Sequence, residues 1–205
     1  MITEDWGAGG GSHDHGGRGF GFGFGPCAAY DRRVAFQLDT DLPTPLAPLA
    51  WLIGRWEGAG VIGYPTIEEA QFGQEIEFSH DGRPFLSYVS RMWRLDDAGN
   101  QVEPLATETG YWRPVATSED PENPGTELEV LLVHPTGICE IYLGRVDGPR
   151  IDLQTDLVAR TSTAKEYTAA TRLYGLVESD LLWALDMAAE GQPLQSHASA
   201  RLKRV

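Results

Sequence analysis

The sequence predicts an all-β protein, a ten-stranded antiparallel up-and-down barrel with one short helix before the first strand. Apolar and polar residues alternate with period two in ten segments of strand length between residues 54 and 205. The connections between these segments are short and rich in glycine, which joins them as antiparallel neighbours. Ten such strands, with no helix to cover a sheet face, close most simply into a barrel that has no open edges. A sandwich of two sheets is the second choice.

The chain divides into three parts by composition. Residues 1–26 are dominated by glycine and contain the alternating GFGFGFG run of residues 19–25. Ordering so many glycines costs much conformational entropy, so the sequence predicts a disordered tail there. Residues 27–45 are predicted to be a linker, and residues 46–205 are predicted to form the barrel.

Length, composition and charge exclude several classes of protein. A chain of 205 residues with 41% hydrophobic residues has room for one ordinary domain and an extension. A net charge of −14 argues against a nucleic-acid partner and against docking on an anionic membrane. Neither a signal peptide nor an apolar run long enough to span a membrane is visible, which predicts a cytoplasmic protein. Cys27 and Cys139 form no disulfide framework or metal motif, and we expect two buried or inert thiols in a reducing compartment.

The short helix is predicted just before the first strand. Thr44 stands as the N-cap, Pro45 takes the first helical position and Gly54 can end the helix. Four apolar residues fall on one face at helical spacing: Leu46, Leu49, Ala50 and Ile53.

The strands are predicted to have one dry face. Leu128, Val130 and Leu132 alternate with Glu127 and Glu129, as expected for a strand with one side in a core. Ten strands leave more room than eight, so we expect an apolar cavity inside the barrel. The predicted strands are residues 55–62, 70–79, 84–95, 101–115, 126–134, 137–146, 150–160, 165–177, 181–189 and 196–205.

A literal GxGxxG pattern occurs between Gly58 and Gly63, but its context does not suit a dinucleotide site. Such a site requires a strand, a turn and then a helix, and Pro65 would interrupt that helix at its start. Walker, HExxH, GxSxG and SxxK patterns are also missing from the sequence. Dinucleotide binding and the common hydrolase chemistries therefore have no support.

Four of the five histidines have simple explanations. His13 and His15 lie in the tail, where two imidazoles on a flexible segment supply too few fixed metal ligands. His80 and His134 each lie beside a turn, as half-exposed polar rings often do. His197 begins the final strand, and alternation places it on the face opposite Ala198. From the residues alone, His197 is either a ligand or a side chain that points to solvent.

Two motifs resemble the nitrobindin family. The run GRWEGAG of residues 54–60 matches the family's GxWxGxG signature, and YPT of residues 64–66 follows it, as in that family. Near the C-terminus, MAAEGQPLQSHASARLKRV resembles the family's closing strand, which carries a histidine that binds haem iron. The resemblance covers roughly residues 46–205. The signature positions are Gly54, Trp56, Gly58 and Gly60.

The resemblance implies a fold, a cofactor and its contacts. Nitrobindins are ten-stranded barrels of the lipocalin or fatty-acid-binding type that hold one b-type haem per chain, with ferric iron, at one end. The resemblance places His197 at the position of the axial haem ligand, and it places Thr66 and Lys165 at positions that contact haem. On simpler interpretations, Thr66 is a turn hydroxyl and Lys165 a surface residue. Trp56 is more often a core side chain than a ligand contact.

The function implied by the resemblance is the isomerisation of peroxynitrite to nitrate at ferric haem, with reversible binding of nitric oxide. Peroxynitrite and nitric oxide are then the small-molecule partners, and a homodimer is left open. The competing hypothesis is a carrier of a fatty acid or another apolar ligand, since one fold supports many functions. A purely structural or partner-binding barrel is the third alternative.

Overall fold

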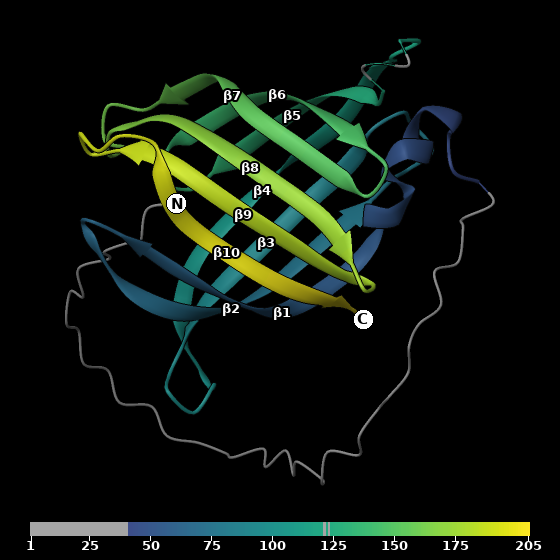
Figure 1. The fold of residues 1–205 in the computed structure, drawn as a ribbon. Helices are drawn as coiled ribbons and strands as arrows, with labels where there is room; N and C mark the ends of the chain where they lie inside the picture. Colours follow the sequence, from purple (N-terminus) through teal and green to yellow (C-terminus); the bar gives the residue numbers. More distant parts are fainter. Residues whose placement is uncertain (1–40, 121, 123) are drawn as a thin grey trace, which may run out of the picture.

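The computed structural model describes residues 41–205 except residues 121 and 123, and these residues form a closed barrel of ten antiparallel strands (Figure 1). The predicted tail, residues 1–26, and most of the predicted linker, residues 27–45, lie outside the described part. His13, His15 and Cys27 lie outside it as well.

Each strand pairs with its neighbours in the chain, and β1 pairs with β10 to close the barrel. The predicted ten-stranded up-and-down barrel is confirmed, and the two-sheet alternative is wrong. Lys165 was predicted to begin a strand but lies in the connection before β8. The strands are β1 (Gly54–Tyr64), β2 (Ile67–Ser79), β3 (Leu86–Leu95), β4 (Gln101–Thr117), β5 (Thr126–His134), β6 (Ile138–Asp147), β7 (Arg150–Arg160), β8 (Tyr167–Val177), β9 (Asp180–Ala189) and β10 (Gln195–Arg204).

The short helix is present, but it is a 3₁₀ helix, η1 (Thr44–Leu52), seen as the blue coil at the right of Figure 1. Pro48 lies inside it and has no N–H to donate, which disfavours an α-helix there. With three residues per turn, Leu46, Leu49 and Leu52 lie above one another, and each is fully buried. The prediction of Ile53 on this face was therefore wrong, because it assumed an α-helical spacing.

The N-cap of η1 is Pro43, and no side chain caps the helix. The predicted cap at Thr44 and the predicted first helical position at Pro45 were therefore both wrong by one residue, because the helix begins at Thr44. Helix ends commonly differ from a prediction by one or two residues. Within the described residues, no helix has the length and apolar character needed to cross a membrane.

The interior is filled by large side chains and is not uniformly apolar. The predicted alternation of β5 is confirmed, since Leu128, Val130 and Leu132 are all buried. Bulky rings such as Trp112 and Tyr142 are also fully buried. The expectation of an apolar interior is wrong in one region, where charged residues are buried together. These include Glu108, Glu140 and Arg172.

The GRWEGAG motif forms the beginning of β1 and joins it to η1 and β10. The Trp56 side chain is fully buried, and its Nε1 donates to the carbonyl oxygen of Leu52 at 2.7 Å. Arg204, at the end of β10, lies over the Trp56 ring at 4.1 Å and donates to the carbonyl oxygens of Trp51, at 2.6 Å, and Ile53. The motif therefore packs the end of the barrel that η1 covers, as expected for a core tryptophan.

Glycine in this motif allows the strands that close the barrel to approach one another. A Cβ atom on Gly60 would overlap the carbonyl oxygen of Ser199 and lie 2.5 Å from the Phe72 ring. Gly58 would similarly overlap the carbonyl oxygen of Arg201. The predicted scaffold role of these two glycines is consistent with this crowding.

We expect Gly60→Ala to lower the free energy of unfolding by about 1–3 kcal/mol, the usual cost of overpacking. Gly63→Ala is the matched control on the same strand, because a Cβ there would have its nearest neighbour at 3.6 Å, an ordinary contact. Urea denaturation of both variants measures the difference. Equal stability of the two variants would show that β1 and β10 are not closely packed at Gly60.

Candidate functional site

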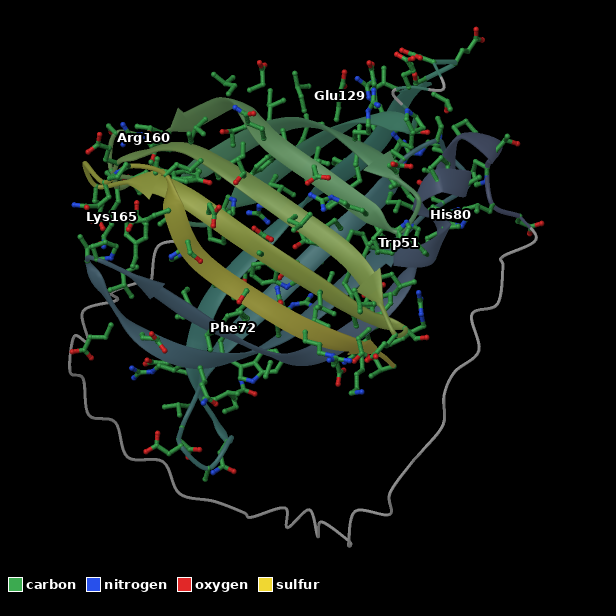
Figure 2. The ribbon with its side chains drawn as sticks, viewed as in Figure 1. Trp51, Phe72, His80, Glu129, Arg160 and Lys165 are labelled. Atoms are coloured by element: carbon green, nitrogen blue, oxygen red, sulfur yellow. The ribbon has the colours of Figure 1, made fainter. Side chains whose placement is uncertain are left out.

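The predicted site residues cluster by topology at the end of the barrel opposite η1, which we call the mouth. Thr66 lies in the turn between β1 and β2, Lys165 in the connection between β7 and β8, and His197 near the start of β10. Figure 2 shows Lys165 at this end and Trp51, which belongs to η1, at the other. Gly54 and Trp56 of the sequence motif lie at the η1 end.

His197 lies in a β-bulge. Ser196 pairs with Asp186, and Ala198 pairs with the next residue of β9, Leu185, so His197 is the extra residue between them. Consequently His197 and Ala198 are both buried, at 2% and 3% exposure. The prediction that His197 faces opposite to Ala198 was wrong, because simple alternation does not hold across a bulge. The solvent-facing alternative is wrong too.

Backbone and ring contacts fix the orientation of His197. Its Nδ1 lies 3.1 Å from the carbonyl oxygen of Gly63, which can only accept, so Nδ1 carries the proton and donates. In the neutral ring, the lone pair is then on Nε2. The Tyr64 ring packs against the imidazole edge to face, with 5.5 Å between centroids. Tyr64 is itself fixed, because its hydroxyl accepts from the Ala189 amide at 2.9 Å and donates to the Met187 carbonyl oxygen at 3.1 Å.

A hollow lies beside this histidine. It has a volume of about 490 Å³, and it is formed where the end of β1 and the beginning of β2 meet the beginning of β10. His197, Tyr64 and Ile67 are among its lining residues. A space of this size falls within the usual range for small-molecule and cofactor sites.

The structure brings Thr66 and Lys165 together through a third residue, Glu190. Thr66 Oγ1 donates to Glu190 Oε2 at 2.5 Å, and Lys165 Nζ lies 3.6 Å from Glu190 Oε1. Glu190 has a positive φ of 49°, which is uncommon for a residue other than glycine. Sequence reasoning missed Glu190, since an acidic residue before a Gly-Gln-Pro turn reads as an ordinary solvated side chain.

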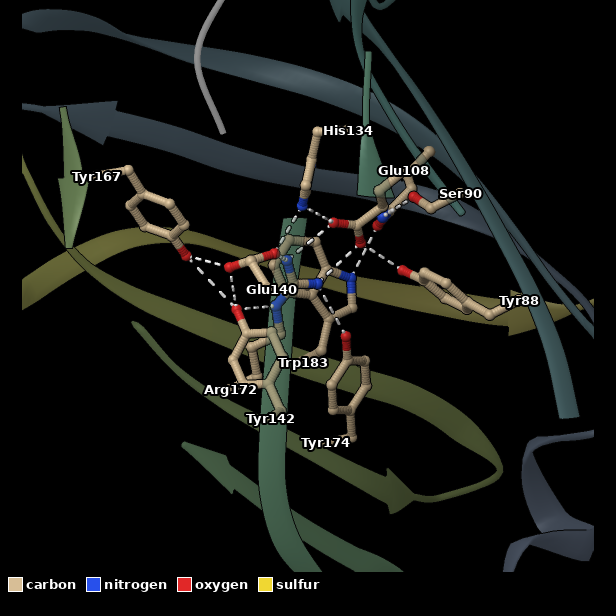
Figure 3. Close-up of polar contacts among 11 residues, drawn as sticks. Tyr88, Ser90, Glu108, His134, Glu140, Tyr142, Tyr167, Arg172, Tyr174 and Trp183 are labelled. Atoms are coloured by element: carbon tan, nitrogen blue, oxygen red, sulfur yellow. Dashed lines mark hydrogen bonds and ion pairs between the residues drawn. The ribbon is translucent and has the colours of Figure 1, made fainter. Parts of the chain in front are cut away.

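A second polar group, which we call the barrel cluster, is buried inside the barrel (Figure 3). Arg172 Nη1 and Nη2 donate to the two carboxylate oxygens of Glu108, each at 2.8 Å, and Nη2 lies 3.4 Å from Glu140 Oε2. His134 Nε2 lies 2.6 Å from the same Glu140 oxygen. His134 is only 8% exposed, so its prediction as a half-exposed residue beside a turn was wrong. Tyrosine hydroxyls complete the cluster by donating to the glutamates, from Tyr88, Tyr142 and Tyr167.

The charges in the barrel cluster depend on one another. Burial alone would raise the pKa of Glu108, but the charge and hydrogen bonds of Arg172 lower it to about 2. Burial likewise opposes ionisation of Glu140, and the charge of Arg172 and the hydrogen bond of His134 hold its pKa well below the usual range. Burial, followed by the charge of Glu140, raises the pKa of Tyr167 well above 10. Both carboxylates are therefore ionised at neutral pH, and Tyr167 stays a neutral donor.

We expect the protein to lose stability in acid through Glu108. Its folded pKa, about 2, is lower than the ordinary glutamate value of 4.5, so its contribution to stability is fully present above the unfolded pKa and is lost as pH falls towards 2. The difference corresponds to roughly 3 kcal/mol. Chemical denaturation between about pH 7 and 3 measures it. In Glu108→Gln the amide does not titrate, so a variant with an unchanged acid profile would contradict this assignment.

The barrel cluster had a signal in the sequence that the predictions did not use. Glu108 has the same strand parity as Trp112, Glu140 the same as Tyr142, and Arg172 the same as Tyr174. A charged residue on the apolar side of each of three alternate strands, β4, β6 and β8, indicates that the charges meet inside the barrel.

Comparisons with known proteins agree with the fold. Residues 45–204 match the model of the family described as "THAP4-like, heme-binding beta-barrel domain". A "Ferric nitrobindin-like protein" of Kineococcus radiotolerans is 58% identical over 179 residues, covering 84% of this chain and 99% of the relative. A "Peroxynitrite isomerase" of Leifsonia xyli subsp. xyli is 49% identical over 197 residues, covering 82% of this chain and 98% of the relative.

A solved structure also matches. The crystal structure of Rv2717c from M. tuberculosis has a TM-score of 0.68 and 38% sequence identity, and the match covers 80% of this chain and 99% of the other. Both the family match and the two relatives extend over most of the described barrel. The chain therefore belongs to the family of THAP4-like, heme-binding β-barrel domains, the nitrobindin family that its two sequence motifs predict.

Proposed function

We propose that this chain binds one haem b through His197 and, with the iron ferric, isomerises peroxynitrite to nitrate and binds nitric oxide reversibly. The observation that carries the proposal is the His197 imidazole, buried in a bulge at the mouth with Nδ1 donating to the Gly63 carbonyl oxygen. Metal-binding histidines are usually oriented by such a hydrogen bond from the other ring nitrogen. The name of the Leifsonia relative supports the reaction.

The residues present at the mouth suit haem. A neutral imidazole is a suitable haem ligand, and in the tautomer that donates from Nδ1 the lone pair that would bind iron is on Nε2. Lys165 is a cation at the rim, with 47% of its side chain exposed, and is suited to pairing with a haem propionate. In the haem-bound protein, the propionate would compete with Glu190 for this ammonium group. Thr66, exposed in the first turn, supplies a hydroxyl beside the same pair.

These contacts separate what the haem would contribute to the reaction from what the residues of the chain contribute. Bound ferric haem would supply the iron chemistry that converts peroxynitrite to nitrate. His197 would hold this iron at the mouth, and the Gly63 carbonyl oxygen and the Tyr64 ring orient His197. The net charge of −14 gives no long-range attraction for an anionic substrate, so association is not expected to be electrostatically steered.

The fatty-acid carrier is the competing function, and the interior counts against it. An acyl chain needs a long apolar lumen, whereas the buried Arg172, Glu108 and Glu140 side chains cross the interior of this barrel. Inserting an acyl chain among them would break charge-assisted hydrogen bonds that are shielded from water, at a cost of several kcal/mol.

The proposal is tested by adding ferric haem to the full chain, recording the Soret band, and then mixing the complex with peroxynitrite. We expect a shifted Soret band with one haem per chain, and faster decay of peroxynitrite with nitrate as the main product. The haem-free chain is the control for decay, and free haem with serum albumin is the control for unspecific binding. An unshifted Soret band, or decay no faster than with the haem-free chain, would refute it.

A further inference from the structure

The outer face of the barrel carries an apolar trough that the proposed haem site does not use. It has a volume of about 730 Å³ and lies over β8, β9, β10 and β1, which face the viewer in Figure 1. Outward residues of these strands line it, and several are exposed apolar side chains: Val61 at 47%, Leu173 at 39% and Val177 at 49%. Exposed apolar patches with a polar rim often mark binding sites.

Strand pairing explains why this face is hollow. One row across the four strands runs from Val61 to Ser199, then to Ala184 and then to Leu173. Two small side chains in the middle of the row are thus flanked by two larger ones. Adjacent strands are about 4.8 Å apart, so the row from Val61 to Leu173 is about 14 Å wide. The result is a trough with apolar walls and a low floor.

A second copy of the chain does not fill this trough well. A symmetric dimer through this face would bring the same patch of both subunits together. Two concave surfaces would then face each other, and neither would fill the other. The trough needs a narrow ridge of apolar side chains, and the barrel is closed, so it offers no strand edge for an added strand.

The chain itself contains such a ridge in the GFGFGFG run of residues 19–25. In an extended segment, alternate side chains point the same way, so Phe20, Phe22 and Phe24 share one face over about 14 Å. The intervening glycines let the backbone lie close to the floor. We propose that this run docks in the outer trough as an intramolecular ligand of the barrel.

The connecting segment is long enough for this contact. Sixteen residues separate Phe24 from Asp41, where the described part begins, and fully extended they span roughly 55 Å. A strand of eleven residues is only about 36 Å long, so the run can reach any point on the face. Tethering also gives an effective concentration in the millimolar range, which lets a weak apolar contact form. Because Val61 and Ser199 line both hollows, the docked run would lie directly beside the His197 hollow.

Disulfide trapping tests the proposal. In a chain with Cys27→Ser and Cys139→Ser, Phe22→Cys is combined either with Leu173→Cys in the trough or with Leu131→Cys on β5. The two target positions are matched, since Leu173 is 39% and Leu131 is 41% exposed. A disulfide forms only when the Cα atoms approach within about 7 Å. In a glutathione buffer, we expect at least a tenfold higher effective concentration for the trough pair.

Three results would overturn the proposal. Equal effective concentrations for the two pairs would show that the run has no preference for the trough. A disulfide-linked dimer in place of an internal disulfide would assign the trough to a second copy. Finally, adding Phe20→Ser and Phe24→Ser to the trough pair should lower its effective concentration to that of the control. If it does not, the phenyl rings do not drive docking.

Discussion

Replacing Arg172 with methionine is expected to lower the free energy of unfolding by about 3–5 kcal/mol, the cost of removing one partner from a buried ion pair. The guanidinium is the only Arg or Lys group that is buried among the described residues, and it donates to both oxygens of Glu108. Without it, Glu108 and Glu140 are left as buried carboxylates with only neutral donors and His134 nearby. Urea denaturation at pH 7 measures the loss.

Arg150→Met is the matched control for this variant. Arg150 also makes a two-pronged contact, with both oxygens of Asp152 at 2.7 Å, but both side chains are more than half exposed. Exposed pairs contribute about 0–1 kcal/mol.

The pH dependence of the stability of Arg172→Met provides a second test. Without Arg172, burial is expected to raise the glutamate pKa values, so the stability deficit should shrink as pH falls below about 5. A deficit below about 1 kcal/mol at neutral pH would show that the barrel cluster is not what holds this region.

Replacing His197 with alanine is expected to weaken haem binding by more than about 100-fold, since loss of a residue that only orients a ligand already costs 10–100-fold. Haem titration followed at the Soret band measures the affinity. The barrel should stay folded, because His197 is the extra residue of a bulge and forms no ladder pair. Circular dichroism of the haem-free variant checks that the fold is kept.

His80→Ala is the control, because His80 lies at the η1 end of the barrel (Figure 2) and its Nδ1 accepts from the Gly82 amide at 3.3 Å. It should bind haem as the unchanged chain does. Added imidazole should restore part of the Soret band of His197→Ala by occupying the space that the side chain leaves. A variant that keeps its haem affinity without imidazole would contradict the ligand role of His197.

Much of the fold follows from local pattern. Period-two alternation and turn residues are local properties, and they predicted the bounds of β5 and β7 without error. The helix was placed correctly, but its type was not, because Pro48 changes the backbone geometry without changing the apolar character of the segment. Strand ends were less exact, as at Lys165, since the last pairs of a strand depend on contacts with its neighbour.

The candidate site was predicted less completely, because it depends on contacts between distant parts of the chain. The motif resemblance indicated His197, but alternation misplaced its side chain, since a bulge is visible only in the pairing of β10 with β9. The role of Glu190 depends on two turns that meet at the mouth. In the barrel cluster, Arg172 contacts Glu140 and Glu108, which lie 32 and 64 positions earlier in the chain. Only a comparison of strand parity across several strands could have predicted these contacts.

The bulge in β10 also bears on how such a barrel can change over time. The strands on either side keep their register whatever side chain stands at position 197, because the ladder bypasses that residue. With the ligand role proposed for His197, a single substitution there would remove the iron ligand or replace it with a different donor, while the strand pairing on both sides stays the same. The side chain at position 197 can therefore change without a change in strand pairing, so the chemistry of this protein can evolve separately from its fold.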